Sequence, residues 1–142
     1  MKVLNITCID FNKFSGPAVS TIALSRFLVR DSRIRKLIHI NLFPSKKEFD
    51  DFKILNTRSV FRLFKLIRKY DTILLQSHYI PYYLLIGLLC KIYKKPYYIF
   101  PRGSLTINAQ NIKPIKKKLG NVVFNRLICG AKAVFYLTSK EL

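Results

Sequence analysis

The stretch at residues 101–105 brings together residue types that can recognise an anionic substrate. It reads Pro-Arg-Gly-Ser-Leu and follows an apolar run at residues 97–100 that has the composition of a strand. The Arg102 guanidinium offers paired N–H donors that suit a carboxylate or a phosphate. Gly103 lets the backbone approach a ligand closely, and Ser104 adds a hydroxyl beside it. These three residues are candidate site residues, and a structural turn with an exposed arginine is the alternative interpretation.

A second polar group ends another apolar run, at residues 73–76. Gln76, Ser77 and His78 follow one another there, so they place hydrogen-bonding groups at the tip of a neighbouring strand. His78 alone is more typical of a packed side chain than of a catalytic base. We expect the three residues to line a substrate pocket.

Ser15, Gly16 and Pro17 form a break between a first apolar strand and a first helical pattern. A glycine at a helix start allows close approach, and the N–H groups of that first turn can hold a phosphate. No G-x-G-x-x-G pattern and no P-loop lysine follow, which disfavours dinucleotide and ATP binding. Ser15 and Gly16 are therefore candidates for a phosphate-facing loop, with a plain turn as the alternative.

Strand and helix patterns alternate along the chain, which predicts an α/β fold with a Rossmann-like open parallel sheet and helices on both faces. Ligands of such sheets collect at the carboxyl ends of the strands, so Gly16 and Arg102 should lie along one rim. We expect strands at residues 3–9, 36–43, 73–76, 97–100 and 133–137, and helices at about 18–28, 59–70, 82–93 and 115–128, with another helix opening at Thr138.

The length of 142 residues fits one domain. The three cysteines are far apart in apolar runs without metal-ligand spacing, which favours buried free thiols in a reducing compartment and predicts no metal site. The first residues are too weakly apolar for a secretory signal, so we expect a cytoplasmic protein. Residues 72–90 carry no charged side chain, but Pro81 interrupts them and favours a buried helix over a membrane span.

The order of these segments resembles the amino-terminal domain of family 4 glycosyltransferases with the GT-B fold. The resemblance covers a first strand with a Gly-Pro loop, residues 71–81 before a proline-started helix, and the Pro-Arg-Gly-Ser-Leu segment after the strand at 97–100. A lysine-rich segment and a closing strand with Thr138 and Ser139 complete it. The Pro-Arg-Gly-Ser-Leu segment is its most specific part.

The resemblance implies roles for individual residues. Arg102 stands where many relatives have an active-site histidine, with Gly103 beside it, and Gly16 matches the glycine that lines the donor diphosphate. Gln76 and Ser77 fall where a histidine and a glycine of another motif usually stand, which with His78 and Ser104 implies the acceptor pocket. The family's second domain, with most nucleotide contacts and two glutamates seven residues apart, is not in this sequence. We therefore expect an apparently truncated half that is inactive alone.

The resemblance further implies a retaining transferase that needs no cofactor and no metal. Its donor would be a nucleotide-sugar, and its acceptor a saccharide or a lipid-linked molecule in cell-surface polysaccharide or lipopolysaccharide synthesis.

The formal net charge of +19 predicts a negative partner. A membrane surface at the inner face of the cell membrane fits both this charge and the habit of related enzymes. A non-catalytic membrane-associated α/β module is the alternative, and a nucleic-acid binder is a weaker one, because no nucleic-acid motif is present. The basic residues fall in a helical stripe, Arg58, Arg62, Lys65 and Lys69, and in a lysine cluster, Lys116, Lys117 and Lys118.

Overall fold

The computed structural model describes residues 1–13, 15–45, 49–77, 79–102 and 114–136, and for residues 114–119 it describes the backbone only. Within this part the chain forms one six-stranded sheet in the order β3-β2-β1-β4-β5-β6, and every pairing is parallel. The predicted α/β class with an open parallel sheet is confirmed. The strands are β1 (Lys2–Thr7), β2 (Lys36–Asn41), β3 (Ile54–Asn56), β4 (Thr72–Gln76), β5 (Tyr97–Phe100) and β6 (Ala133–Val134).

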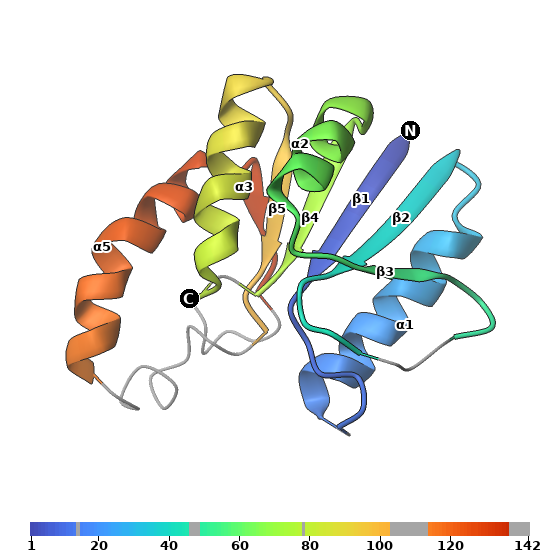
Figure 1. The fold of residues 1–142 in the computed structure, drawn as a ribbon, viewed down its shortest axis with the longest axis horizontal. Helices are drawn as coiled ribbons and strands as arrows, with labels where there is room; N and C mark the ends of the chain where they lie inside the picture. The colour runs from blue at the N-terminus through green and yellow to red at the C-terminus, as the bar shows by residue number, and fades with distance from the viewer. Residues whose placement is uncertain (14, 46–48, 78, 103–113, 137–142) are drawn as a thin grey trace.

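The helices lie on both faces of the sheet (Figure 1). α2 (Val60–Lys69), α3 (Pro81–Ile92) and α5 (Pro114–Gly130) form one layer, in which α3 contacts both of its neighbours. α1 (Gly16–Arg30) packs on the opposite face, over β2. Proline begins α3 and occupies the first turn of α1, where its missing N–H removes no helical hydrogen bond.

The apolar core lies between the sheet and the three-helix layer. Alternate residues of β1 and β4, such as Leu4, Ile6 and Ile73, point to this side and are fully buried. The core is completed by Leu63 of α2 and Tyr83 of α3. The Tyr83 hydroxyl donates to the carbonyl oxygens of Ile6 at 3.0 Å and Gln76 at 3.3 Å, which ties the ends of β1 and β4 to α3.

The face under α1 is polar by comparison. Asn5 and Thr7 of β1, His39 of β2 and Gln76 of β4 are all buried, and α1 covers part of this face with Thr21 and Ser25. Buried polar groups require hydrogen-bond partners, so this face depends on specific pairing rather than on apolar area.

The structure differs from the sequence expectations at β3 and at two of the cysteines. A sixth strand, β3, pairs with β2 at residues 54–56, where we expected neither a strand nor a helix. Residues 72–90, which carry no charge, divide into β4 and the twelve-residue helix α3, as we expected. Cys90 is buried as expected, but Cys8 is half-buried and Cys129 on α5 is exposed. The expected helix from Thr138 lies outside the described residues.

Helix α2 begins later than the basic stripe requires. Ser59 caps the helix by accepting from the Arg62 amide, so Arg58 lies before the first turn. The Arg58 side chain donates from Nε to the Leu42 carbonyl at 2.6 Å, directly after β2. The prediction that Arg58 belongs to this stripe is wrong. Arg62, Lys65 and Lys69 are exposed on α2, whereas Leu63 and Ile67 are buried.

No helix in the part of the chain that the structure describes is long and apolar enough to span a membrane.

Candidate functional site

The order of the strands defines where a ligand fits. β1 is followed in the chain by β2 on one side, and β4 then pairs with β1 on the other side, so the connections diverge between β1 and β4. In open parallel sheets the crevice at this point, outside the carboxyl ends of the strands, is where ligands bind. Thr7, Gln76 and Phe100 end β1, β4 and β5 at this edge, and α1 begins there at Gly16. We call it the carboxyl edge.

Arg102 is held at the carboxyl edge by Gln76. The Arg102 Nε donates to Gln76 Oε1 at 3.0 Å, and Nη2 donates to the same oxygen. The guanidinium also lies 5.7 Å from the centre of the Phe100 ring. Gln76 is a neutral acceptor, so these bonds orient the guanidinium without neutralising its charge. Two residues that the sequence placed at neighbouring strand tips are thus brought into direct contact.

This contact continues as a chain of hydrogen bonds beneath α1. Gln76 Nε2 donates to Asn5 Oδ1 at 2.8 Å, and Asn5 Nδ2 lies 3.0 Å from His39 Nδ1. The Asn5 amide also donates to Ser25 Oγ at 3.5 Å, and Ser25 donates in turn to the Thr21 carbonyl at 2.8 Å. We call Arg102, Gln76, Asn5 and His39 the polar chain. It connects the segment that follows β5 with β4, β1 and β2.

The polar chain has one direction. A guanidinium can only donate, so Gln76 Oε1 must accept and Gln76 Nε2 must donate. Asn5 Oδ1 then accepts, and its Nδ2 donates to His39 Nδ1. His39 therefore carries its proton on Nε2 and is neutral. Burial lowers the pKa of His39 to about 4, which agrees with a neutral ring at pH 7.

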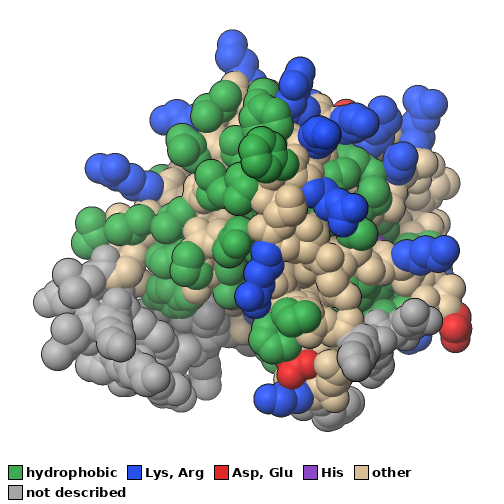
Figure 2. All heavy atoms as spheres, viewed as in Figure 1, with side chains coloured by type: hydrophobic (Ala, Val, Ile, Leu, Met, Phe, Trp, Pro, Cys, Tyr) green, Lys and Arg blue, Asp and Glu red, His purple; other side chains and the backbone are tan. Residues whose placement is uncertain are grey.

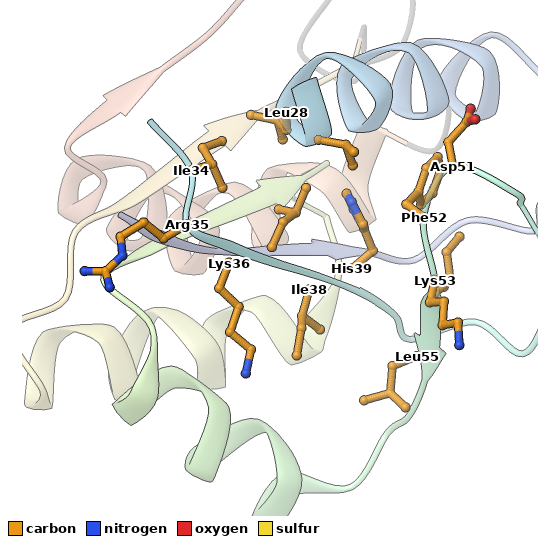
Figure 3. A pocket seen from close by; sticks show the side chains of 13 residues that line it. Leu28, Ile34, Arg35, Lys36, Ile38, His39, Asp51, Phe52, Lys53 and Leu55 are labelled. Atoms are coloured by element: carbon orange, nitrogen blue, oxygen red, sulfur yellow. The ribbon is translucent and has the colours of Figure 1, made fainter. Parts of the chain in front are cut away.

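His39 Nε2 is buried without a hydrogen-bond partner in the described part of the structure. The ring centre lies 4.7 Å from that of Phe52, beside a cavity of about 540 Å³ between α1, β2 and β3 (Figure 3). Much of the cavity wall is apolar, with Leu28, Ile34 and Leu55 among its residues. His39 therefore belongs both to the polar chain and to the lining of this cavity, whereas Arg102 does not line the cavity.

Two residues of the carboxyl edge have strained backbones. Ser77 has φ 114° and Arg102 has φ 59°, values that glycine adopts readily and other residues rarely do. The Ser77 amide donates to the Phe100 carbonyl at 2.8 Å, which fixes the backbone after β4 against the end of β5. Strain of this kind persists only where surrounding contacts impose it, and it gathers at functional sites.

The loop between β1 and α1 is fixed by Asn41, at the end of β2. The Asn41 side chain donates to the Ile9 carbonyl at 2.8 Å and accepts from the Ile9 amide and from Thr7 Oγ1, both at 3.1 Å. Ser15 caps α1, and its hydroxyl accepts from the Ala18 amide at 3.3 Å. A Cβ built on Gly16 meets no atom within 4 Å, so open space lies beside this residue at the helix start.

The predicted site residues are therefore only partly placed. Arg102, Gln76 and Ser77 lie together, and Ser15 and Gly16 lie on the same edge of the sheet. Gly103, Ser104 and His78 lie outside the described residues, and so do the side chains of Lys116, Lys117 and Lys118. Asn5, His39 and Ser25 were not predicted, although a polar residue within an apolar strand pattern is a signal for such a network.

Cys8 lies directly after β1 at this edge and is a free thiol. Burial raises the pKa of the half-buried Cys8 thiol and the charge of Arg58 lowers it, with a net rise. Among these residues no group of three or more His, Cys, Asp or Glu is placed to hold a metal ion.

Comparisons with known proteins give one similar structure. No protein-family model and no curated protein matches the chain. The crystal structure of S. aureus homoserine dehydrogenase at pH 6.0 aligns with a TM-score of 0.44 and 17% identity, over 96% of this chain and 33% of that one. The chain thus spans about a third of the length of that protein.

Replacing Ser77 by glycine should stabilise the protein. Glycine adopts φ 114° without strain, so we expect Ser77→Gly to raise the free energy of unfolding by about 1 kcal/mol. Ser32→Gly is the control, because Ser32 is exposed and has no positive φ. Urea denaturation of both variants measures the difference. A Ser77→Gly protein that is less stable than the wild type would show that the Ser77 backbone is not strained.

Burial of neutral His39 makes stability depend on pH. The folded-state pKa of about 4 lies below the ordinary 6.5, so the unfolded chain binds the proton more readily. The contribution of neutral His39 to the free energy of unfolding is fully present above pH 6.5. It should fall by on the order of 3 kcal/mol as the pH drops to about 4. Urea denaturation at several pH values in this range should show that the free energy of unfolding of His39→Gln depends less steeply on pH than that of the wild type. An unchanged dependence on pH would refute the assignment of a neutral, buried His39.

Proposed function

We propose that this chain is the acceptor-side, amino-terminal domain of a retaining GT-B glycosyltransferase similar to family 4. The reaction would move a sugar from a nucleotide-sugar to a saccharide or lipid-linked acceptor in cell-surface polysaccharide or lipopolysaccharide synthesis. A second domain would supply most of the contacts to the nucleotide-sugar. The observation that carries this proposal is the contact between Arg102 and Gln76 at the carboxyl edge.

Arg102 would act through its charge. Transfer from a nucleotide-sugar develops negative charge on the leaving diphosphate, and a fixed cation beside that centre stabilises it without reorganisation. The half-buried guanidinium is oriented by Gln76 and by the Phe100 ring, which suits this role. Gly103 would lie beside it, and Ser77, His78 and Ser104 would border the acceptor; for Gly103, His78 and Ser104 this rests on the sequence alone.

Gly16 would admit the diphosphate at the start of α1. The helix N-terminus carries partial positive charge, and the space beside Gly16 would let phosphate oxygens approach the backbone. Ser15 would contribute by capping the helix and fixing its first turn.

The backbone at Ser77 adds independent support. The resembled family usually has glycine at this position, and φ 114° is a conformation that favours glycine. This chain keeps the conformation with a serine, which fits a loop whose shape serves a ligand.

A dinucleotide-dependent reaction fits less well. Dinucleotide-binding sheets place an acidic residue near the end of the second strand to bind a ribose hydroxyl. Asn41 stands at that end here, is fully buried, and is occupied with the β1–α1 loop. Eight residues, 8–15, separate β1 from α1 without the glycine pattern of a tight phosphate turn.

The membrane partner is also a proposal. Arg62, Lys65 and Lys69 lie exposed on α2, beside Phe61, which is 82% exposed. An exposed aromatic next to cations suits the interface of an anionic bilayer, and we place the protein at the inner face of the cell membrane. Lys116, Lys117 and Lys118 would add to this surface. A non-catalytic membrane module would show the same binding without sugar transfer, and RNA binding on filters would favour the nucleic-acid alternative.

Gly16→Ala should slow transfer strongly without unfolding the protein. A methyl group would occupy the space proposed for the diphosphate, so we expect turnover by the enzyme joined to its donor-binding domain to fall about a hundredfold. The measurement is release of nucleoside diphosphate from a panel of nucleotide-sugars, together with thermal unfolding.

Gly120→Ala on α5 is the matched control, since its Cβ would make only an ordinary contact with Phe124 at 3.9 Å. Full turnover by Gly16→Ala would refute the placement of the diphosphate. A wild-type enzyme that released no nucleoside diphosphate from any donor would refute the proposed function.

A further inference from the structure

A groove between α3 and α5 lies apart from the carboxyl edge. It has a volume of about 830 Å³ and reaches the start of β5 at Pro96 and Tyr97, which is the opposite end of the sheet. The helices approach closely at its base, where a Cβ on Gly87 would clash with the Leu127 side chain. None of the residues assigned to the proposed transfer reaction lines it.

The groove combines an apolar floor with a cationic rim. Leu84, Leu88, Val123 and Leu127 are among its apolar residues, and Leu88 and Val123 are 55% and 48% exposed. Figure 2 shows exposed apolar side chains on this helical face, with Lys and Arg along its upper margin. The cations that line the groove are Lys91, Lys94, Lys95, Arg126 and Lys132.

The segment that forms the groove supplies no acidic residue to its rim, because the sequence has no Asp or Glu between Asp71 and Glu141. The dipole at the end of α3 favours Lys91 and Lys94 whatever the partner is. It does not account for Arg126, which lies inside α5, or for Lys132, which precedes β6. Lys94 also keeps φ 51°, a conformation in which glycine is preferred after a helix.

We propose that this groove binds an anionic phospholipid of a bilayer surface, with the head group among the cations and the acyl chain along the apolar floor. This rests on the membrane partner of the proposed function and gives it a site distinct from α2. Aliphatic side chains offer no stacking surface for bases, so the floor favours a lipid over a nucleic acid. Cations around exposed apolar residues match the two parts of an anionic lipid.

Two charge variants with equal loss of charge test the rim. Lys91→Gln/Lys94→Gln/Lys132→Gln removes three groove cations, and Arg30→Gln/Arg35→Gln/Lys36→Gln removes three exposed cations from the α1 side. Binding to vesicles of phosphatidylcholine with phosphatidylglycerol should weaken on the order of a hundredfold for the groove variant and far less for the control. Equal losses would mean that net charge alone drives binding and would overturn the proposal.

The chain contains no tryptophan, so a single one can report contact with the acyl chains. Leu88→Trp places it in the groove, and Phe27→Trp places it on α1, where Phe27 is 63% exposed. With the same vesicles carrying brominated acyl chains, the emission of Leu88→Trp should be quenched and shifted to the blue, and that of Phe27→Trp should not. Equal or absent quenching of the two would overturn the site.

A third variant, Arg62→Gln/Lys65→Gln/Lys69→Gln, tests whether binding to the vesicles depends on α2 or on the groove. If this variant is the only one that loses binding, the membrane proposal survives and the groove proposal fails. These measurements use no sugar donor, so a missing transferase activity would leave the lipid result unaffected, and an absent lipid signal would leave the transferase proposal standing.

Discussion

The carboxyl edge of the sheet depends on a hydrogen-bond chain that can run in only one direction. Because Arg102 cannot accept a hydrogen bond, its contact with Gln76 sets the orientation of two amides and the tautomer of a histidine in turn. The links from Gln76 to Asn5 and from Asn5 to His39 are buried, so reversing either would leave donors facing donors in a low-dielectric interior. The position of Arg102 is therefore tied to the three strands β4, β1 and β2 and not only to the segment that follows β5.

The two ends of the parallel strands differ in their residues. The carboxyl edge has strained backbone at Ser77 and Arg102 and an open helix start at Gly16. The opposite end of the strands collects cations at helix ends and strand starts, as Lys69, Lys91 and Lys132 show, because parallel strands with returning helices bring those positions together. This separation lets recognition of a substrate and attachment to a surface be altered independently.

Much of the fold could be predicted from the chain, because apolar runs and helical spacing reflect local burial. The strand β3 could not, since Ile54 and Leu55 alone make no pattern. Arg58 was misplaced because helical spacing aligns it with Arg62, whereas Ser59 caps the helix and leaves Arg58 before the first turn. For the site, strand order predicted that Gln76 and Arg102 would share an edge. The partners Asn5 and His39 depend on register across separate strands, which residue types alone do not specify.

The ring nitrogens of His39 give the most direct test of the polar chain. Two-bond and three-bond correlations between ring protons and ¹⁵N nuclei at pH 7 distinguish a protonated nitrogen from an acceptor. We predict a neutral His39 with its proton on Nε2, and a shift of both nitrogens when Gln76→Leu breaks the chain. A His39 ring protonated on Nδ1, or indifferent to Gln76→Leu, would contradict the account.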